Sequence, residues 1–192
     1  MTANLSRLLN ALGLVAIDTV LVLAFADQLW FRDLPCPLCI LQRVGFIAAG
    51  FCIALNLMFG PRPSHYGLAI LGAVAGGFVS ARQILLNIAH NSAYGSAVFG
   101  LHLYTWALLL FALIVVGSAI MLQFEHQFAA TDVLPSRLKV LTVLAVALLA
   151  TLALGKVIST LAICGAGLCP YNPAGYMIFN DNLSLTLLGK TP

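Results

Sequence analysis

The stretch Leu34-Pro35-Cys36-Pro37-Leu38-Cys39-Ile40-Leu41-Gln42-Arg43 decides the fold, because a polar turn becomes a long apolar run within it. Proline suits the first turn of a helix, where its missing N–H would have had no partner, so we expect a membrane-spanning helix to begin at about Pro37. Cys36 and Cys39 then lie at the helix N-terminus, where free N–H groups and the macrodipole favour a thiolate. Arg43 follows Cys39 by four residues and shares its helical face, so its charge also favours the thiolate.

A C-x-x-C pair has three interpretations. It can be half of a zinc site, although zinc normally requires further Cys or His ligands nearby. It can be an inert structural disulfide, although two intervening residues at a helix start form a short loop better suited to exchange. The third interpretation is a redox-active dithiol, which the spacing and the position favour over the other two.

The composition is that of an integral membrane protein. The chain has 192 residues, of which 61% are hydrophobic and 8% charged, and its mean hydropathy is +1.03. A soluble domain of this size cannot bury so much apolar surface. The formal net charge of +3 comes from scattered basic residues, so it does not indicate nucleic-acid binding. No small-residue cleavage site follows the first apolar segment, which we therefore expect to be retained as a helix.

Five apolar segments are long enough to cross a bilayer, at about 20 residues each. The predicted spans are about residues 8–30, 37–59, 66–89, 101–124 and 138–163. We therefore expect an all-α integral membrane protein. Residues 1–163 would form its transmembrane helical domain, and residues 164–192 a tail. A polar connection at Glu125–Arg137, with room for an interfacial helix, precedes the fifth span.

Basic residues in short loops set the orientation of such a protein. Arg7, Arg62, Arg137 and Lys139 fall on one side if the spans alternate, which predicts a cytoplasmic N-terminus and a C-terminus outside. Cysteines at both ends of the chain then share one compartment. Cys36 and Cys39 emerge on the outer face, and so do Cys164 and Cys169. Outside a bacterial inner membrane disulfides persist, so the two pairs face an oxidising compartment. We expect the fifth cysteine, Cys52, to be a packing residue within the second span.

Cys36-Pro37-Leu38-Cys39-Ile40-Leu41-Gln42-Arg43 resembles the C-x-L-C-x-x-x-R signature of the bacterial disulfide bond formation protein B family, DsbB. Ala81-Arg82-Gln83 in the third span and Leu101–Trp106 at the start of the fourth are also similar to family segments. The resemblance covers about Leu8 to Gln123.

The resemblance implies an antiparallel four-helix bundle, here with a fifth transmembrane helix and a periplasmic tail. It implies that the helix-start dithiol passes electrons to ubiquinone or menaquinone at the outer end of the bundle. Cys39 would face the quinone, Cys36 would exchange with a second cysteine pair, and Arg43 would assist the quinone. The second pair would reoxidise a periplasmic thioredoxin-fold oxidase, which supports disulfide bond formation.

The chain departs from the family pattern in the loop His90–Gly100. The family carries its second cysteine pair there, whereas this loop has no cysteine, and the remaining candidates are Cys164 and Cys169. Either the second pair has moved to the tail, or the tail disulfide is structural and the protein has another partner. We favour the first explanation, because two glycines between these cysteines make the loop flexible enough for exchange.

Other polar residues in the spans are further candidates. Arg82 is a second candidate to hold the quinone oxygens, because arginine within a membrane usually marks function. His102 is a further candidate for the quinone site, where it would handle quinone protons near neutral pH. Asp18 and Lys156 are costly within the bilayer, and we consider that they pair with each other or with Arg82.

The main alternative from another functional class is a metal-handling membrane protein. Its outer-face ligands would be Cys36, Cys39, Cys164, Cys169 and His102.

Overall fold

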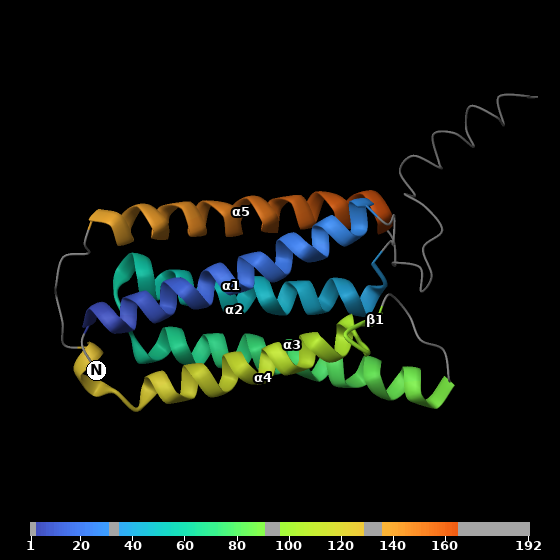
Figure 1. Cartoon of the computed structure of the whole chain (residues 1–192), viewed down its shortest axis with the longest axis horizontal. Helices are drawn as coiled ribbons and strands as arrows, with labels where there is room; N and C mark the ends of the chain where they lie inside the picture. The colour runs from blue at the N-terminus through green and yellow to red at the C-terminus, as the bar shows by residue number, and fades with distance from the viewer. Residues whose placement is uncertain (1–2, 31–34, 91–96, 129–135, 165–192) are drawn as a thin grey trace, which may run out of the picture.

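A computed structural model describes residues 3–30, 35–90, 97–128 and 136–164. Five long α-helices make up most of the described chain (Figure 1). They are α1 (Ala3–Trp30), α2 (Pro37–Phe59), α3 (Pro63–His90), α4 (Leu103–Leu122) and α5 (Ser136–Cys164). All five are long and apolar enough to cross a membrane, which confirms the prediction of an all-α, multi-pass membrane protein.

The helix boundaries agree with the predicted spans to within a few residues, apart from two helix starts. α1 begins at Ala3, about one turn before the predicted start, because the polar residues Asn4, Ser6 and Arg7 continue the helix although they lower the hydropathy of this segment. α3 begins at Pro63, three residues before the predicted start at about residue 66. Proline is compatible with the first helical turn, so Pro63 begins this helix instead of preventing it.

α2 lies at the centre of the arrangement, packed against α1, α3 and α5, while α4 packs mainly on α3. Small residues allow α2 and α3 to approach closely. A Cβ at Gly45 of α2 would lie 2.8 Å from the Cα of Gly76 on α3. The ring of Phe111 from α4 covers this crossing and stacks on Phe46 with ring centroids 4.0 Å apart. Gly72, one turn before Gly76, also faces α2, where a Cβ would lie 3.2 Å from the backbone nitrogen of Ala49.

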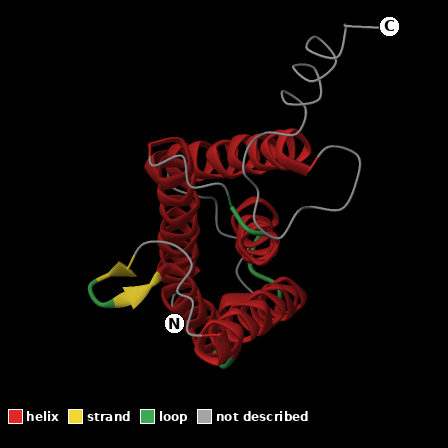
Figure 2. Cartoon of the chain, turned by 90° about the vertical axis from the view of Figure 1, so that its right-hand side faces the viewer, coloured by secondary structure: helices red, strands yellow, loops and turns green. Residues whose placement is uncertain are grey.

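Because the helices alternate in direction, the ends of α1 and α5 lie beside the start of α2, at the right of Figure 1. We call this end of the bundle the dithiol end. A short hairpin precedes α4 at the same end, formed by β1 (Ala97–Val98) and β2 (Leu101–His102). Figure 2 shows the hairpin projecting sideways from the helices. Its turn has positive φ at both Phe99 and Gly100, as a type I′ turn requires. Phe99 is 94% exposed. The sequence predicts a loop over His90–Gly100 and a helix from about residue 101, so the hairpin differs from the prediction.

The opposite end of the bundle is held together by buried polar side chains. Asn10 of α1 donates from Nδ2 to the hydroxyl of Tyr66 on α3 at 2.6 Å and accepts from Asn56 of α2 at 3.3 Å. Ser6 and Tyr66 both donate to Oε1 of Gln127. This network connects three helices to the 3-10 helix η1 (Glu125–Phe128), which lies at the start of the polar connection before α5.

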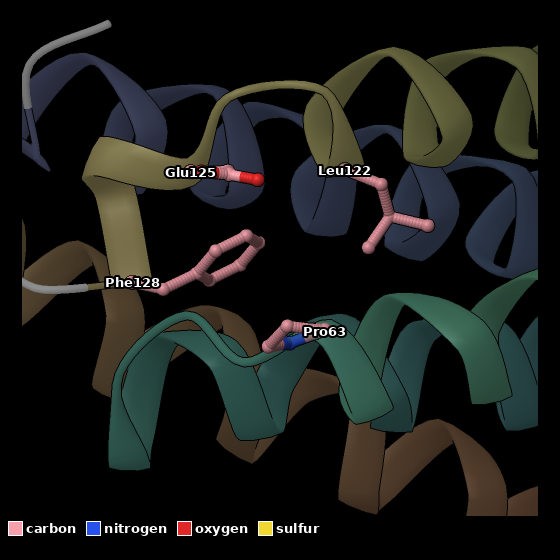
Figure 3. Close-up of a pocket in the computed structure, with 4 residues that line it drawn as sticks. All are labelled: Pro63, Leu122, Glu125 and Phe128. Atoms are coloured by element: carbon pink, nitrogen blue, oxygen red, sulfur yellow. The ribbon is translucent and has the colours of Figure 1, made fainter.

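A hollow of about 510 Å³ lies beside η1, lined by Pro63, Leu122, Glu125 and Phe128. The ring of Phe128 points toward the space between η1 and the start of α3 (Figure 3). This hollow is at the far end of the bundle from Cys36 and Cys39.

Candidate functional site

Cys36 and Cys39 form the candidate site at the start of α2. Cys36 is the N-cap, with extended backbone angles, and its sulfur accepts a hydrogen bond from the backbone N–H of Cys39 at 3.2 Å. Pro37 occupies the first turn as predicted. The two sulfurs lie 2.6 Å apart, and both cysteines are free. Two thiols this close need little movement to reach the bond length of a disulfide, which is about 2.05 Å.

The two cysteines differ in accessibility and in charge. Cys36 is 6% exposed, whereas Cys39 is only partly buried. The hydrogen bond with Cys39, followed by burial, raises the pKa of the Cys36 thiol well above its ordinary value. Cys36 is therefore the member of the pair that keeps its proton at neutral pH.

Gln83 of α3 faces both sulfurs. Its Nε2 donates to Sγ of Cys36 and to Sγ of Cys39, each at 3.6 Å, within the range of a weak bond to sulfur. Gln42 of α2 donates to Oε1 of Gln83 at 2.8 Å and so orients the amide with its N–H groups toward the sulfurs. Gln42 and Gln83 are both buried. A fixed N–H donor in an apolar region stabilises negative charge on sulfur.

Arg43 bridges α2 and α1 one turn below Cys39. Its Nη1 donates to Oε1 of Gln28 at 2.8 Å, and its Nη2 donates to the backbone carbonyl of Ala24 at 2.9 Å. The Arg43 charge also interacts electrostatically with both sulfurs of the pair. The guanidinium is thus held in one orientation by α1 while its charge acts on the dithiol.

A cavity of about 470 Å³ lies between α1 and α4. We call it the α1–α4 groove. It is lined almost entirely by apolar side chains, with Asn10, Tyr66 and Ser118 at one end. From α2 it is lined by Phe46 and Ile53, which follow Cys39 by seven and fourteen residues. Positions seven residues apart share a helical face, so the groove follows the face of α2 that carries Cys39.

The second predicted cysteine pair is described only in part. Cys164 is the last residue of α5, is buried, and is disulfide-bonded. It lies at the dithiol end of the bundle, as the alternation of the spans predicts (Figure 1). Cys169 lies outside the described residues, so its pairing with Cys164 stays a prediction.

The two other predicted quinone-binding residues lie away from the sulfurs. Arg82 is exposed on α3, and it is its neighbour Gln83 that reaches the cysteines. His102 is the N-cap of α4, where its ring stacks on Tyr104 with centroids 5.2 Å apart. Their predicted roles stay predictions.

The pairing considered for Asp18 and Lys156 is not present. Both residues are buried, and neither the carboxylate oxygens of Asp18 nor Nζ of Lys156 has a hydrogen-bond partner among the described residues. Lys156 lies instead over the ring of Phe25, 3.6 Å from its centroid.

Metal ligands do not gather anywhere in the described part of the chain. No group of three or more His, Cys, Asp or Glu side chains is found there. The metal-handling alternative therefore depends on Cys169, which is not described.

Three glutamines at the site were missed as functional residues. Gln28 was not singled out, and Gln42 and Gln83 were quoted only as parts of family segments. A signal was present, because an amide within an apolar span is costly unless it has a hydrogen-bond partner. Which groups these amides meet depends on the helix rotations, which sequence alone does not fix.

Comparison with known proteins gives a family match that includes the residues of the dithiol site. Residues 6–93 match the family model described as Disulfide bond formation protein DsbB. The match contains both cysteines of the dithiol, Arg43, and the three glutamines that surround them. It confirms the resemblance that the cysteine signature indicated. α4 and α5 lie outside it.

Curated relatives carry the same name. The chain is 40% identical over 58 residues to Disulfide bond formation protein B of Azoarcus sp., covering 28% of this chain and 35% of the relative. It is 35% identical over 80 residues to the protein of Chromohalobacter salexigens, covering 39% and 46%. It is 33% identical over 84 residues to that of Nitrosomonas eutropha, covering 42% and 52%. The chain thus spans between a third and about half of these relatives' length. No solved structure matches.

Proposed function

We propose that this chain, whose residues 6–93 carry the sequence of the disulfide bond formation protein B family, is a membrane thiol:disulfide oxidoreductase that uses a quinone as electron acceptor. The observation that carries the proposal is the geometry of the dithiol. Two free sulfurs 2.6 Å apart lie at the start of an intramembrane helix and share the N–H donor of Gln83. An inert disulfide would need neither this donor nor the charge of Arg43.

A quinone is supported by an apolar groove whose nearest lining residue on α2, Phe46, lies two helical turns from Cys39. The α1–α4 groove follows the Cys39 face of α2 and is lined by apolar side chains within the spans, as a polyprenyl chain requires. Ubiquinone and menaquinone both carry such a polyprenyl chain. Arg43 supplies a fixed cation near the sulfurs, where negative charge develops as electrons leave the dithiol.

The chemistry balances as a two-electron oxidation. As two electrons leave, an S–S bond forms between Cys36 and Cys39, and the two thiols release one proton each. A bound quinone would accept these two electrons together with two protons and leave as the quinol. Electrons flow from the dithiol to the quinone only if the reduction potential of the quinone lies above that of the Cys36–Cys39 disulfide. A difference of about 30 mV corresponds to roughly 1.4 kcal/mol for two electrons.

We propose that Cys164 and Cys169 supply electrons to this dithiol. The disulfide at Cys164 lies at the same end of the bundle as Cys36. A reduced periplasmic thioredoxin-fold oxidase would reduce this disulfide, and the resulting thiols would then reduce the Cys36–Cys39 disulfide by exchange. This route places the dithiol end in the periplasm and the N-terminus in the cytoplasm of a bacterial inner membrane, in agreement with the basic residues of the loops.

Steady-state quinone reduction by purified protein tests the proposal. With dithiothreitol as donor, wild-type protein should reduce ubiquinone catalytically, and Cys36→Ser and Cys39→Ser should each abolish turnover. Cys52→Ser is the matched control, because Cys52 lies in the same helix but packs against the core away from the pair. Turnover retained in either dithiol variant would disprove the scheme.

A further inference from the structure

A chain of hydrogen bonds leads from α5 to the arginine of the site. Ser159 of α5 accepts a hydrogen bond from Nε2 of Gln28 at 2.7 Å. Oε1 of the same Gln28 accepts from Nη1 of Arg43 at 2.8 Å. Gln28 is 2% exposed, so water does not compete for either bond. α5 thus reaches the guanidinium of α2 through one side chain of α1.

Two neighbouring contacts fix α5 at this level of α1. Lys156, one turn before Ser159, lies over the ring of Phe25, one turn before Gln28. Gly155 allows the approach, because a Cβ there would lie 3.1 Å from Cζ of Phe25. Ser159 therefore meets Gln28 at a packed contact between the two helices.

The geometry of an amide makes this contact informative. Oxygen and nitrogen of the Gln28 side chain lie in one plane, so a bond that fixes Nε2 also fixes the direction of Oε1. Arg43 has a planar guanidinium held at two points, by Gln28 and by the carbonyl of Ala24. When Oε1 turns away, one of these two points is lost and the plane of the guanidinium is no longer fixed.

We propose that Ser159 is a positioning residue: it holds Gln28, and through Gln28 it sets the orientation in which Arg43 meets the electron acceptor. The inference rests on the proposed function, since it assigns Arg43 to acceptor binding. It concerns a part of the chain outside residues 6–93, so it gives the fifth helix a role at the site beyond carrying Cys164.

The test compares two substitutions at one position. Ser159→Ala removes the acceptor, and we expect the KM for a short-chain ubiquinone to rise about three- to tenfold, with kcat changed less than twofold. Ser159→Thr keeps the hydroxyl and should restore the wild-type KM. The control is Thr151→Val on the same helix, because the Thr151 hydroxyl is exposed and bonds only the carbonyl of Ala147. It should leave KM unchanged.

The Arg43→Ala background separates positioning from general damage. If Ser159 acts through Arg43, Ser159→Ala should have no further effect on KM in this background. The inference is overturned if Ser159→Ala matches Thr151→Val in the wild-type background, or if its effect persists in full without Arg43. In both cases wild-type quinone reduction would still support the proposed function. If wild-type protein reduces no quinone, the proposed function fails, and this inference fails with it.

Discussion

The side-chain amide of Gln83 lies 3.6 Å from the sulfur of Cys39, across the interface between α3 and α2. The contact gives the dithiol a neutral hydrogen-bond donor within the bilayer. Because Gln42 fixes the amide, the donor keeps its direction as charge on the sulfur changes. Gln83 thus stabilises the thiolate without adding a further full charge at the sulfurs.

Replacing Gln83 with leucine should slow oxidation of the dithiol. The thiolate would lose a donor worth about 1–3 kcal/mol in a buried site, so we expect turnover with ubiquinone to fall about tenfold. Stopped-flow quinone absorbance measures the effect. Gln123→Leu is the control, because Gln123 is exposed beyond the end of α4. Equal rates for the two variants would show that Gln83 has only a packing role.

Arg43 and Arg82 should differ in their effects on the acceptor. Arg43→Ala removes the charge that acts on the sulfurs and leaves Gln28 without its donor, so the quinone KM should rise at least tenfold. Arg82→Ala removes an exposed side chain and should change KM less than twofold. The two variants are compared by steady-state kinetics. A larger rise in KM for Arg82→Ala than for Arg43→Ala would instead support the predicted role of Arg82 in quinone binding.

Alkylation of Cys36 should depend strongly on pH. Because the hydrogen bond with Cys39 and burial raise the Cys36 pKa, little thiolate is present at neutral pH, and labelling by iodoacetamide should accelerate only as pH rises above about 8.5, the ordinary thiol pKa. In Cys39→Ser the hydrogen bond with residue 39, which is the larger cause of the raised Cys36 pKa, is weakened. The pH dependence of the labelling rate should therefore shift toward lower pH. Peptide mass spectrometry quantifies the modified Cys36. An unchanged profile in the variant would contradict the assigned cause.

The crossing of α2 and α3 should not tolerate a methyl group. Gly45→Ala places a Cβ against the backbone of Gly76 and should destabilise the fold by about 1–3 kcal/mol. Gly117→Ala is the control, because nothing lies within 4 Å of a Cβ there. A thermal unfolding midpoint in detergent that is lower for Gly45→Ala alone is the expected result. Equal midpoints would contradict the close approach.

The sequence allowed prediction of the helices and of the dithiol, because both depend on local patterns. Apolar runs predicted five spans, and Pro37 predicted the start of α2 to the residue. The hairpin before α4 was not predicted, since Phe99 adopts positive φ, which is uncommon for an aromatic residue.

The surroundings of the dithiol could be predicted only in part. Arg43 was found because it lies one turn from Cys39 on the same helix. Gln83 and Gln28 reach the site from other helices, and their direction depends on rotations that interhelical packing sets. For the same reason Asp18 and Lys156 were considered as a pair, although Lys156 faces Phe25.

The dithiol of α2 should deliver its two electrons to a quinone in a single anaerobic turnover. Protein with the Cys36–Cys39 pair reduced is mixed with excess ubiquinone, and quinol and free thiols are counted together. We expect one quinol for every two thiols lost, with both lost thiols mapped to Cys36 and Cys39. Loss of these thiols without quinol formation, or quinol formation that persists in Cys39→Ser, would contradict this electron transfer.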